Sequence, residues 1–126
     1  ETWNINVLGT LNILESLRKL TKQCVCIMIT SDKCYDNVEW IWGYRENDQL
    51  GGHDPYSASK VCVEFLFNSY QKSFFSKSKK MIATVRAGNV IGGGDYSLDR
   101  LIPDIYKSLK GNKKILIRLQ IFFNSK

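Results

Sequence analysis

The sequence predicts an α/β domain in which helices pack on a parallel β-sheet. Helix-like and strand-like segments alternate along the 126 residues, and this order is typical of a layered α/β fold. The first strand-like run is apolar at every position, which favours a strand buried on both faces, as in a parallel sheet. The pattern starts on a helix, and three strands leave open sheet edges. We therefore expect a doubly wound sheet without its N-terminal strands.

The first half of the chain contains one predicted helix, one strand and one long loop. Apolar residues at helical spacing, led by Leu11 and Leu14, predict an amphipathic helix over about residues 3–20. Residues 24–29 form the apolar run of strand length. Residues 31–55 are polar and rich in Gly, Asp, Asn and Trp, and they predict a loop whose length is typical of a functional or a disordered segment.

The second half repeats the alternation of helix and strand. A predicted helix over about 57–74 has apolar residues nearly all round, so much of it should be buried. A strand over 81–87 leads into a glycine-rich turn at 91–95. A helix over 101–109 and a strand over 115–119 complete the pattern.

Composition and charge exclude several classes of protein. No apolar run approaches the roughly 18 residues that a membrane-spanning helix needs, so we expect no membrane segment. The net charge is +6, but the lysine-rich runs lack the interleaved aromatic residues of a nucleic-acid surface, so we expect no nucleic-acid partner. His53 is the single histidine and the four cysteines form no C-x-x-C pair, so we expect no metal. Cysteines in apolar runs fit a cytoplasmic protein, although disulfides stay open.

Two short motifs carry candidate chemistry. The first is Thr30-Ser31-Asp32-Lys33 at the end of the predicted strand, because ligands of open α/β sheets bind beyond the carboxyl ends of strands. A hydroxyl, a carboxylate and an ammonium group could serve a polar substrate there as hydrogen-bond donor, acid and base. The alternative is structural: Thr30 or Ser31 caps a turn, and Asp32 pairs with Lys33 in solvent.

The second motif is Tyr56-x-x-x-Lys60 at the start of the second predicted helix. Residues four apart lie on the same face of a helix, and a lysine ammonium beside a phenol favours the phenolate. A tyrosine in that environment can exchange a proton near neutral pH. The alternative is an ordinary surface pair, since both residue types are common.

A strand that ends in serine, a loop, and a helix that starts with Tyr-x-x-x-Lys together resemble the short-chain dehydrogenase/reductase superfamily. Residues 6–10 are similar to its N-x-x-G-T helix start, and residues 86–92 are similar to the R-x-x-N-V-x-G strand end of its extended, nucleotide-sugar branch. Within that branch, three further segments resemble the CDP-glucose 4,6-dehydratases, namely residues 30–37, 39–46 and 99–104. The resemblance covers about residues 1–118.

The resemblance implies a partial Rossmann-like fold and a lyase that removes water from CDP-glucose with bound NAD, giving CDP-4-keto-6-deoxyglucose. Tyr56 would take the proton of the sugar 4-hydroxyl, and Lys60 would hold the nicotinamide ribose, so both would contact the cofactor. Ser31 would donate a hydrogen bond to the 4-oxygen of the substrate. Asp32 would protonate the departing 6-hydroxyl, and Lys33 would remove the C5 proton, which requires a desolvated lysine.

The resemblance also assigns residues and partners outside the two motifs. Asn89 would bind the phosphate or sugar of the substrate, with a structural hydrogen bond as its alternative. Arg100 would reach the diphosphate, with a surface salt bridge as its alternative. Asn6 would help to order the active site. The first two helices of this branch commonly form the four-helix bundle of a homodimer. The product would enter nucleotide-sugar metabolism and polysaccharide biosynthesis.

The resemblance places residues 1–126 in a single partial NAD(P)-binding domain. The dinucleotide fingerprint and the substrate domain of the family are missing, and residues 119–126 form a divergent tail, so we expect a fragment. Two alternatives stay open: another nucleotide-sugar epimerase or dehydratase of the same family, or a non-catalytic remnant that only packs or dimerises. For the chain alone we expect no catalysis and weak NAD binding.

Overall fold

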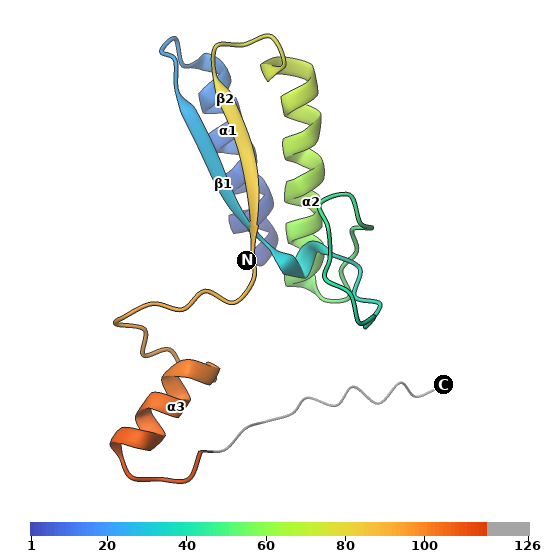
Figure 1. Ribbon diagram of the computed structural model, residues 1–126. Helices are drawn as coiled ribbons and strands as arrows, with labels where there is room; N and C mark the ends of the chain where they lie inside the picture. Colours follow the sequence, from blue (N-terminus) through green and yellow to red (C-terminus); the bar gives the residue numbers. More distant parts are fainter. Residues whose placement is uncertain (116–126) are drawn as a thin grey trace. The chain divides into compact units, whose positions relative to one another are not determined.

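The computed structural model describes residues 1–115, and the chain divides into two compact units (Figure 1). The first unit is Glu1–Gly88 and the second is Asn89–Lys126. The prediction of a single partial domain over residues 1–126 stays a prediction.

The first unit alternates helices with strands, which confirms the predicted α/β class. Its elements in chain order are a π-helical segment (Asn4–Leu8), α1 (Gly9–Lys19), β1 (Val25–Ser31), a 3-10 helix (Asp32–Cys34), α2 (Pro55–Tyr70), a second π-helical segment (Gln71–Phe75) and β2 (Met81–Ala87).

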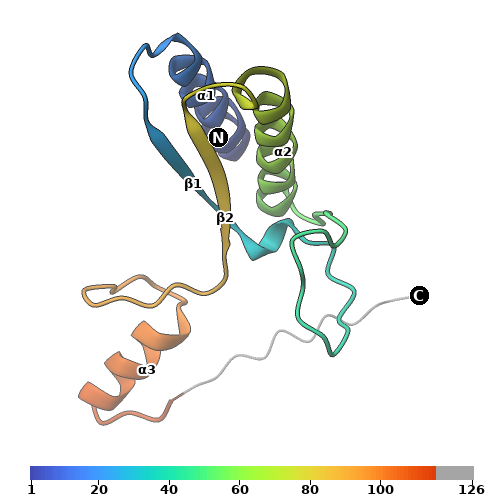
Figure 2. The same cartoon turned by 45° about the horizontal axis from the view of Figure 1, so that its top comes forward.

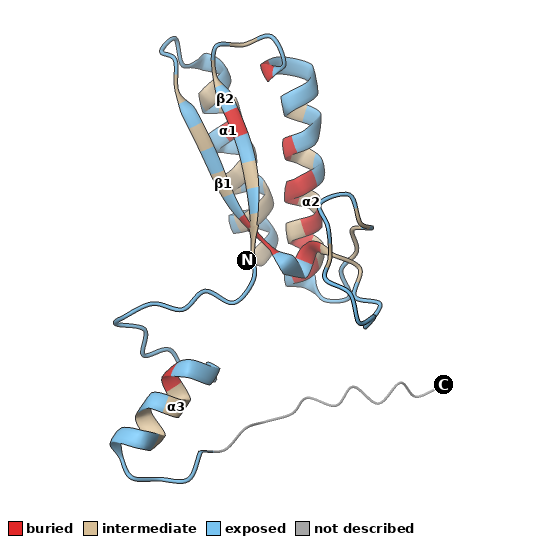
Figure 3. Ribbon diagram, in the orientation of Figure 1, coloured by how far each residue is buried: buried red, intermediate tan, exposed pale blue. Residues whose placement is uncertain are grey.

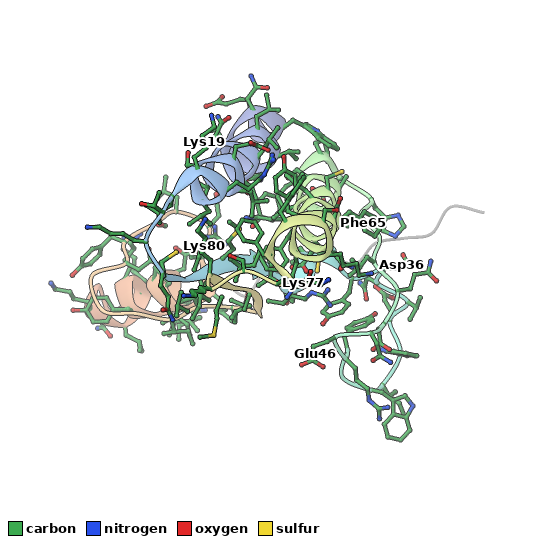
Figure 4. All side chains as sticks on the ribbon, turned by 90° about the horizontal axis from the view of Figure 1, so that it is seen from above. Lys19, Asp36, Glu46, Phe65, Lys77 and Lys80 are labelled. Atoms are coloured by element: carbon green, nitrogen blue, oxygen red, sulfur yellow. The ribbon has the colours of Figure 1, made fainter. Side chains whose placement is uncertain are left out.

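The two strands pair in parallel, from Val25 opposite Met81 to Ser31 opposite Ala87. α2 supplies the crossover that a parallel pair requires. Both α1 and α2 lie on the same side of the sheet (Figures 2 and 4). The first strand continues beyond the predicted residues 24–29, because Ser31 still pairs with β2. Both strands therefore end at one edge of the sheet.

A small hydrophobic core lies between the two helices and the sheet (Figure 3). It contains Leu14 from α1, Phe67 from α2, Phe75 and Ile82, with Met28 of β1 packed against them. Leu14 is fully buried, so the helical spacing that predicted an amphipathic α1 identified its buried face correctly.

A polar contact also ties α1 to α2 beside this core. The Tyr70 hydroxyl donates to Oε1 of Glu15 at 2.5 Å, and Arg18 pairs with the same oxygen at 2.7 Å. The hydrogen bond from Tyr70, followed by that from Arg18, lowers the pKa of Glu15. The same bond raises the pKa of Tyr70. A negatively charged Glu15 and a neutral Tyr70 thus hold the two helices together.

The expectation that β1 is buried on both faces is wrong for this unit. Val25, Ile27 and Ile29 are 67%, 58% and 64% exposed, whereas Cys26 and Met28 are half-buried. The reason is that α1 and α2 cover the same face of the sheet. Much of α2 is buried, as predicted, although Phe65 is exposed.

The second unit contains α3 (Leu101–Lys110), which confirms the predicted helix over 101–109. The Lys107 ammonium donates to the carbonyl of Tyr96 at 2.8 Å and ties the preceding loop to α3. Within that loop Gly94 has a φ of 81°, a left-handed conformation that favours glycine. The predicted strand over 115–119 falls almost entirely outside the described residues, and the tail over 119–126 does so completely. None of the helices in residues 1–115 is long and apolar enough to span a membrane.

Candidate active site

The first motif lies at the carboxyl edge of the sheet, as predicted. Ser31 ends β1 opposite Ala87 of β2, and Asp32 and Lys33 follow in the 3-10 helix. A Cβ added to Gly88 would lie 3.6 Å from Oδ2 of Asp32, so the chain leaving β2 passes close to this carboxylate.

Ser31 is buried and caps the 3-10 helix. Its hydroxyl donates to Oδ1 of Asp32 at 3.2 Å and accepts from the backbone N–H of Lys33 at 3.2 Å. The structural alternative for this serine is therefore confirmed, although capping leaves the residue at the sheet edge. Asp32 and Lys33 are both exposed, so the expected desolvation of Lys33 is not found in the described residues. The first unit leaves their side chains open to solvent.

The second motif starts α2 at the same edge. Tyr56 and Lys60 lie one helical turn apart, and Nζ of Lys60 is 5.6 Å from the centre of the Tyr56 ring. Tyr56 is 46% exposed and Lys60 is half-buried, so solvent reaches the phenol. The pairing of these two residues on one helix face is as predicted.

Asp54 fixes where α2 begins. Its carboxylate accepts from the backbone N–H groups of Tyr56 and Ser57 at 2.8 and 3.1 Å, and the Ser57 hydroxyl completes a capping box. Hydrogen bonds from the side chain and backbone of Ser57, then from Tyr56, and finally the charge of Lys33 lower the pKa of Asp54. The 3-10 helix that carries Asp32 and Lys33 contacts α2, so the two motifs lie next to each other.

Gly52 allows the loop to approach α2 closely. A Cβ at this position would lie 2.4 Å from the backbone nitrogen of Ala58, closer than a real contact allows. A larger residue would push the loop away from the first turn of the helix that carries Tyr56.

A buried serine between the two motif residues was missed by the sequence analysis. Ser59 is fully buried, accepts a hydrogen bond from Nδ2 of Asn6 at 2.9 Å and donates to the carbonyl of Tyr56 at 2.6 Å. Asn6 thus contacts the turn of α2 that carries Tyr56, and its expected role in ordering the site stays a prediction. The sequence did offer a signal for this burial: Ser59 is a small polar residue, and it lies just before the apolar stretch that begins at Val61.

A second missed feature is a buried polar cluster under the sheet edge. Glu64 of α2 is 6% exposed and accepts from the hydroxyls of Thr30 and Thr84 at 2.5 and 3.3 Å. Nη2 of Arg86 donates to the same carboxylate at 3.1 Å. We call this set the Glu64 cluster: Thr30, Glu64, Thr84 and Arg86. The available signal was Glu64 itself, the one charge in the apolar stretch from 61 to 67.

Arg86 also attaches the long loop to the sheet. Its guanidinium lies 4.8 Å from the centre of the Tyr35 ring and donates to the backbone carbonyl of Glu46 at 2.9 Å. Burial alone would lower the pKa of Arg86, but hydrogen bonds to Glu64 and Tyr35 and the charge of Glu64 outweigh it and raise that pKa. Arg86 is thus held as a cation between α2 and the loop.

The loop itself is compact rather than open. Tyr35 forms an antiparallel β-bridge with Leu50, and the rings of Tyr35 and Tyr44 stack with their centres 5.0 Å apart. Trp40 packs against Tyr44 at 5.6 Å. Figure 4 shows Asp36 and Glu46 on this loop beside α2.

Two predicted substrate residues are not brought to the edge by the first unit. Asn89 follows β2 and Arg100 precedes α3, and both are exposed residues of the second unit. Their roles stay predictions. Among residues 1–115, no cluster of histidine, cysteine, aspartate or glutamate side chains could hold a metal ion.

The parallel strands and the crossover helix define a Rossmann-like α/β domain with polar side chains at the carboxyl edge of its sheet. A profile of the family described as GDP-mannose 4,6 dehydratase matches residues 1–117, and the chain belongs to this family.

Two curated relatives are named as 4,6-dehydratases. CDP-glucose 4,6-dehydratase of Salmonella typhimurium is 50% identical over 94% of this chain and 34% of its own length. dTDP-D-glucose 4,6-dehydratase of Dictyostelium discoideum is 35% identical over 89% of this chain and 27% of its own length. The chain thus spans about a third or less of these relatives.

Solved structures of similar proteins confirm the fold. dTDP-glucose 4,6-dehydratase from Bacillus anthracis, in complex with NAD, has a TM-score of 0.76 at 24% identity and covers 90% of this chain and 34% of its own. UDP-glucuronic acid 4-epimerase from Bacillus cereus, in complex with NAD, has a TM-score of 0.72 at 22% identity, covering 89% of this chain and 34% of its own. At these identities the likeness shows the Rossmann-like fold alone.

Proposed function

We propose that the protein carrying this chain is an NAD-dependent lyase that converts CDP-glucose to CDP-4-keto-6-deoxyglucose and water. The observation that carries the proposal is the meeting of Ser31, Asp32 and Lys33 with Tyr56 and Lys60 at one sheet edge. The 50% identity to CDP-glucose 4,6-dehydratase supports the choice of reaction and of nucleotide.

The residues at the edge fit a nicotinamide nucleotide. Nζ of Lys60 makes no hydrogen bond within the described residues, and Tyr56 beside it is open to solvent. Lys60 would donate to the ribose hydroxyls, and its charge would favour the Tyr56 phenolate. When bound, the nicotinamide supplies a hydride acceptor that later returns the hydride to the sugar.

In the first step Tyr56 removes the proton from the sugar 4-hydroxyl while the hydride leaves C4. Ser31, whose hydroxyl proton is donated to Oδ1 of Asp32, would turn that proton to the 4-oxygen and keep this oxygen facing Tyr56. The resulting 4-ketone makes the adjacent C5–H acidic. This role uses a phenol that substrate can reach, and the partial exposure of Tyr56 supports it.

In the second step water is lost from C5 and C6. Lys33 removes the C5 proton, the C5–H electron pair forms the C5–C6 double bond, and the 6-hydroxyl leaves with a proton from Asp32. Both side chains are exposed at the edge, and bound substrate would have to exclude water from them. The hydride then returns to C6, and C5 regains a proton.

The remaining assignments concern partners and place. Asn89 and Arg100 would bind the phosphate side of the substrate. The protein would work in the cytoplasm, in nucleotide-sugar metabolism that supplies polysaccharide biosynthesis. It would be a homodimer formed through α1 and α2, and the exposed Ile13 of α1 and Phe65 of α2 support an apolar contact there. A monomer in sedimentation of the full-length protein at micromolar concentration would contradict the dimer.

The test is turnover of CDP-glucose by the protein expressed from its complete reading frame, followed by mass and NMR of the product. Tyr56→Phe removes the proton acceptor and is expected to lower kcat by roughly 10²–10⁴-fold. Tyr106→Phe in α3 is the matched control and should keep wild-type turnover. A product that retains its 6-hydroxyl but has inverted stereochemistry would contradict the proposal and indicate an epimerase. If the wild type turns over no CDP-glucose, the proposal is also contradicted, and the protein is non-catalytic toward this substrate.

A further inference from the structure

Glu64 is a buried carboxylate that the proposed reaction does not use. It lies four residues after Lys60 on α2, is 6% exposed, and has partners on both strands. We propose that Glu64 is a positioning residue that sets the Ser31 segment and the long loop relative to Tyr56 and Lys60. This inference rests on the proposed function, because it concerns the same edge.

One carboxylate oxygen of Glu64 bonds to the strand that carries the first motif. Oε1 of Glu64 accepts from the hydroxyl of Thr30 at 2.5 Å, and Thr30 is the residue immediately before Ser31. Tyr56 and Lys60 lie on the same rigid helix as Glu64. A single carboxylate therefore connects the strand that carries the hydrogen-bond donor to the helix that carries the proton acceptor.

The other carboxylate oxygen of Glu64 is connected to the long loop through Arg86. Oε2 of Glu64 accepts from Arg86 at 3.1 Å, and Arg86 in turn contacts the ring of Tyr35 and the carbonyl of Glu46. The loop closes on itself nearby, because the N–H of Asp36 donates to Gln49 and the N–H of Gly51 donates to Cys34. The charge of Glu64 thus fixes the cation that holds the loop against β2.

Burial separates this role from catalysis. Glu64 lies under the sheet edge, and its described partners are the other members of the Glu64 cluster. A glutamine in its place could still bond Thr30, but it would leave the half-buried Arg86 without a counter-charge. Loss of the charge should therefore loosen both the contact to Thr30 and the contact to Arg86, while the catalytic side chains remain present.

The first experiment measures hydrogen exchange in the protein expressed from its complete reading frame. Glu64→Gln is expected to speed exchange of the Asp36 and Gly51 amides at least about 10-fold, since opening of the loop becomes easier. The matched control is Glu15→Gln, which weakens the contact between Tyr70 and α1. It should speed exchange near α1 and leave Asp36 and Gly51 unchanged.

The second experiment measures steady-state kinetics with CDP-glucose. Glu64→Gln is expected to lower kcat by roughly 10–100-fold with little change in KM, because misplacement by about an ångström costs that much in rate. The double variant Glu64→Gln with Arg86→Met removes the unpaired, half-buried charge. It should recover thermal stability but keep the low kcat, because nothing then holds the loop.

The outcomes separate the alternatives. Recovery of kcat together with stability in the double variant would show a merely structural role and overturn the inference. Unchanged exchange at Asp36 and Gly51 in Glu64→Gln would also overturn it. If the wild type turns over no CDP-glucose, the proposed function fails, and the exchange result alone decides whether Glu64 sets the geometry of the edge.

Discussion

At the scale of single residues, Asp54 links electrostatics to the start of the helix that carries Tyr56. Its charged form accepts the hydrogen bonds that define the first turn of α2. Because those bonds lower its pKa, the folded state favours the carboxylate more than the unfolded chain does. The stabilisation from Asp54 is therefore present above the ordinary pKa of 3.8 and is lost as pH falls through the lowered value.

Asp54→Ala is expected to lower the unfolding temperature at pH 7 by roughly 4–8 °C, because the helix loses its N-cap. Asp54→Asn should retain most of the stability at pH 7, since asparagine also caps helices. Thermal unfolding monitored by circular dichroism from pH 7 to pH 2 checks both. The difference between wild type and Asp54→Ala should shrink in acid, and a difference independent of pH would contradict this account.

At the scale of elements, the N-terminal π-helical segment is joined to α2 by one buried hydroxyl. Ser59 connects Asn6 to the turn of α2 that contains Tyr56. Since the hydroxyl is fully buried, its removal leaves Asn6 without this partner in a half-buried position. The order of the site edge thus depends partly on a residue that touches neither motif side chain.

Ser59→Ala is expected to reduce the free energy of unfolding by about 1–2 kcal/mol. Ser69→Ala, an exposed serine of the same helix, should change it by less than about 0.5 kcal/mol. Chemical denaturation of both variants measures the difference. A double variant with Asn6→Ala should cost less than the sum of the single changes, and strict additivity would show that the two side chains do not interact.

The predictability of these features depended on how far apart their residues lie in sequence. The edge positions of Ser31 and Tyr56 followed from local periodicity, because parallel strands joined by a helix must end together. The Glu64 cluster could not be predicted in the same way, since Thr30 and Arg86 meet Glu64 only through tertiary packing. The burial of Ile27 was predicted wrongly, because an apolar run does not reveal which elements cover each face of a sheet.

At the scale of the whole molecule, apolar side chains gather on the sheet face away from α1 and α2. Val25, Ile27 and Ile29 of β1 and Met81 and Val85 of β2 are all exposed within the described residues. Exposed apolar strands promote association between copies of a chain. The 126-residue chain expressed by itself should therefore self-associate through this face.

Ile27→Lys tests that expectation directly. The free energy of unfolding should change by no more than about 0.5 kcal/mol, because the side chain is 58% exposed. Light scattering of the 126-residue chain should show less association than in the wild type. Leu14→Lys is the contrasting variant, since burying a charge in the core should prevent folding. A loss of several kcal/mol in Ile27→Lys would mean that the face is covered.

The way in which Arg86 holds the loop has a consequence for sequence variation. The guanidinium contacts the backbone carbonyl of Glu46, so this anchor does not depend on which side chain stands at position 46. Substitutions at position 46 can therefore accumulate without breaking this contact. For a protein engineer, the outer part of the loop is a place to change what approaches the edge, while Glu64 and Arg86 stay untouched.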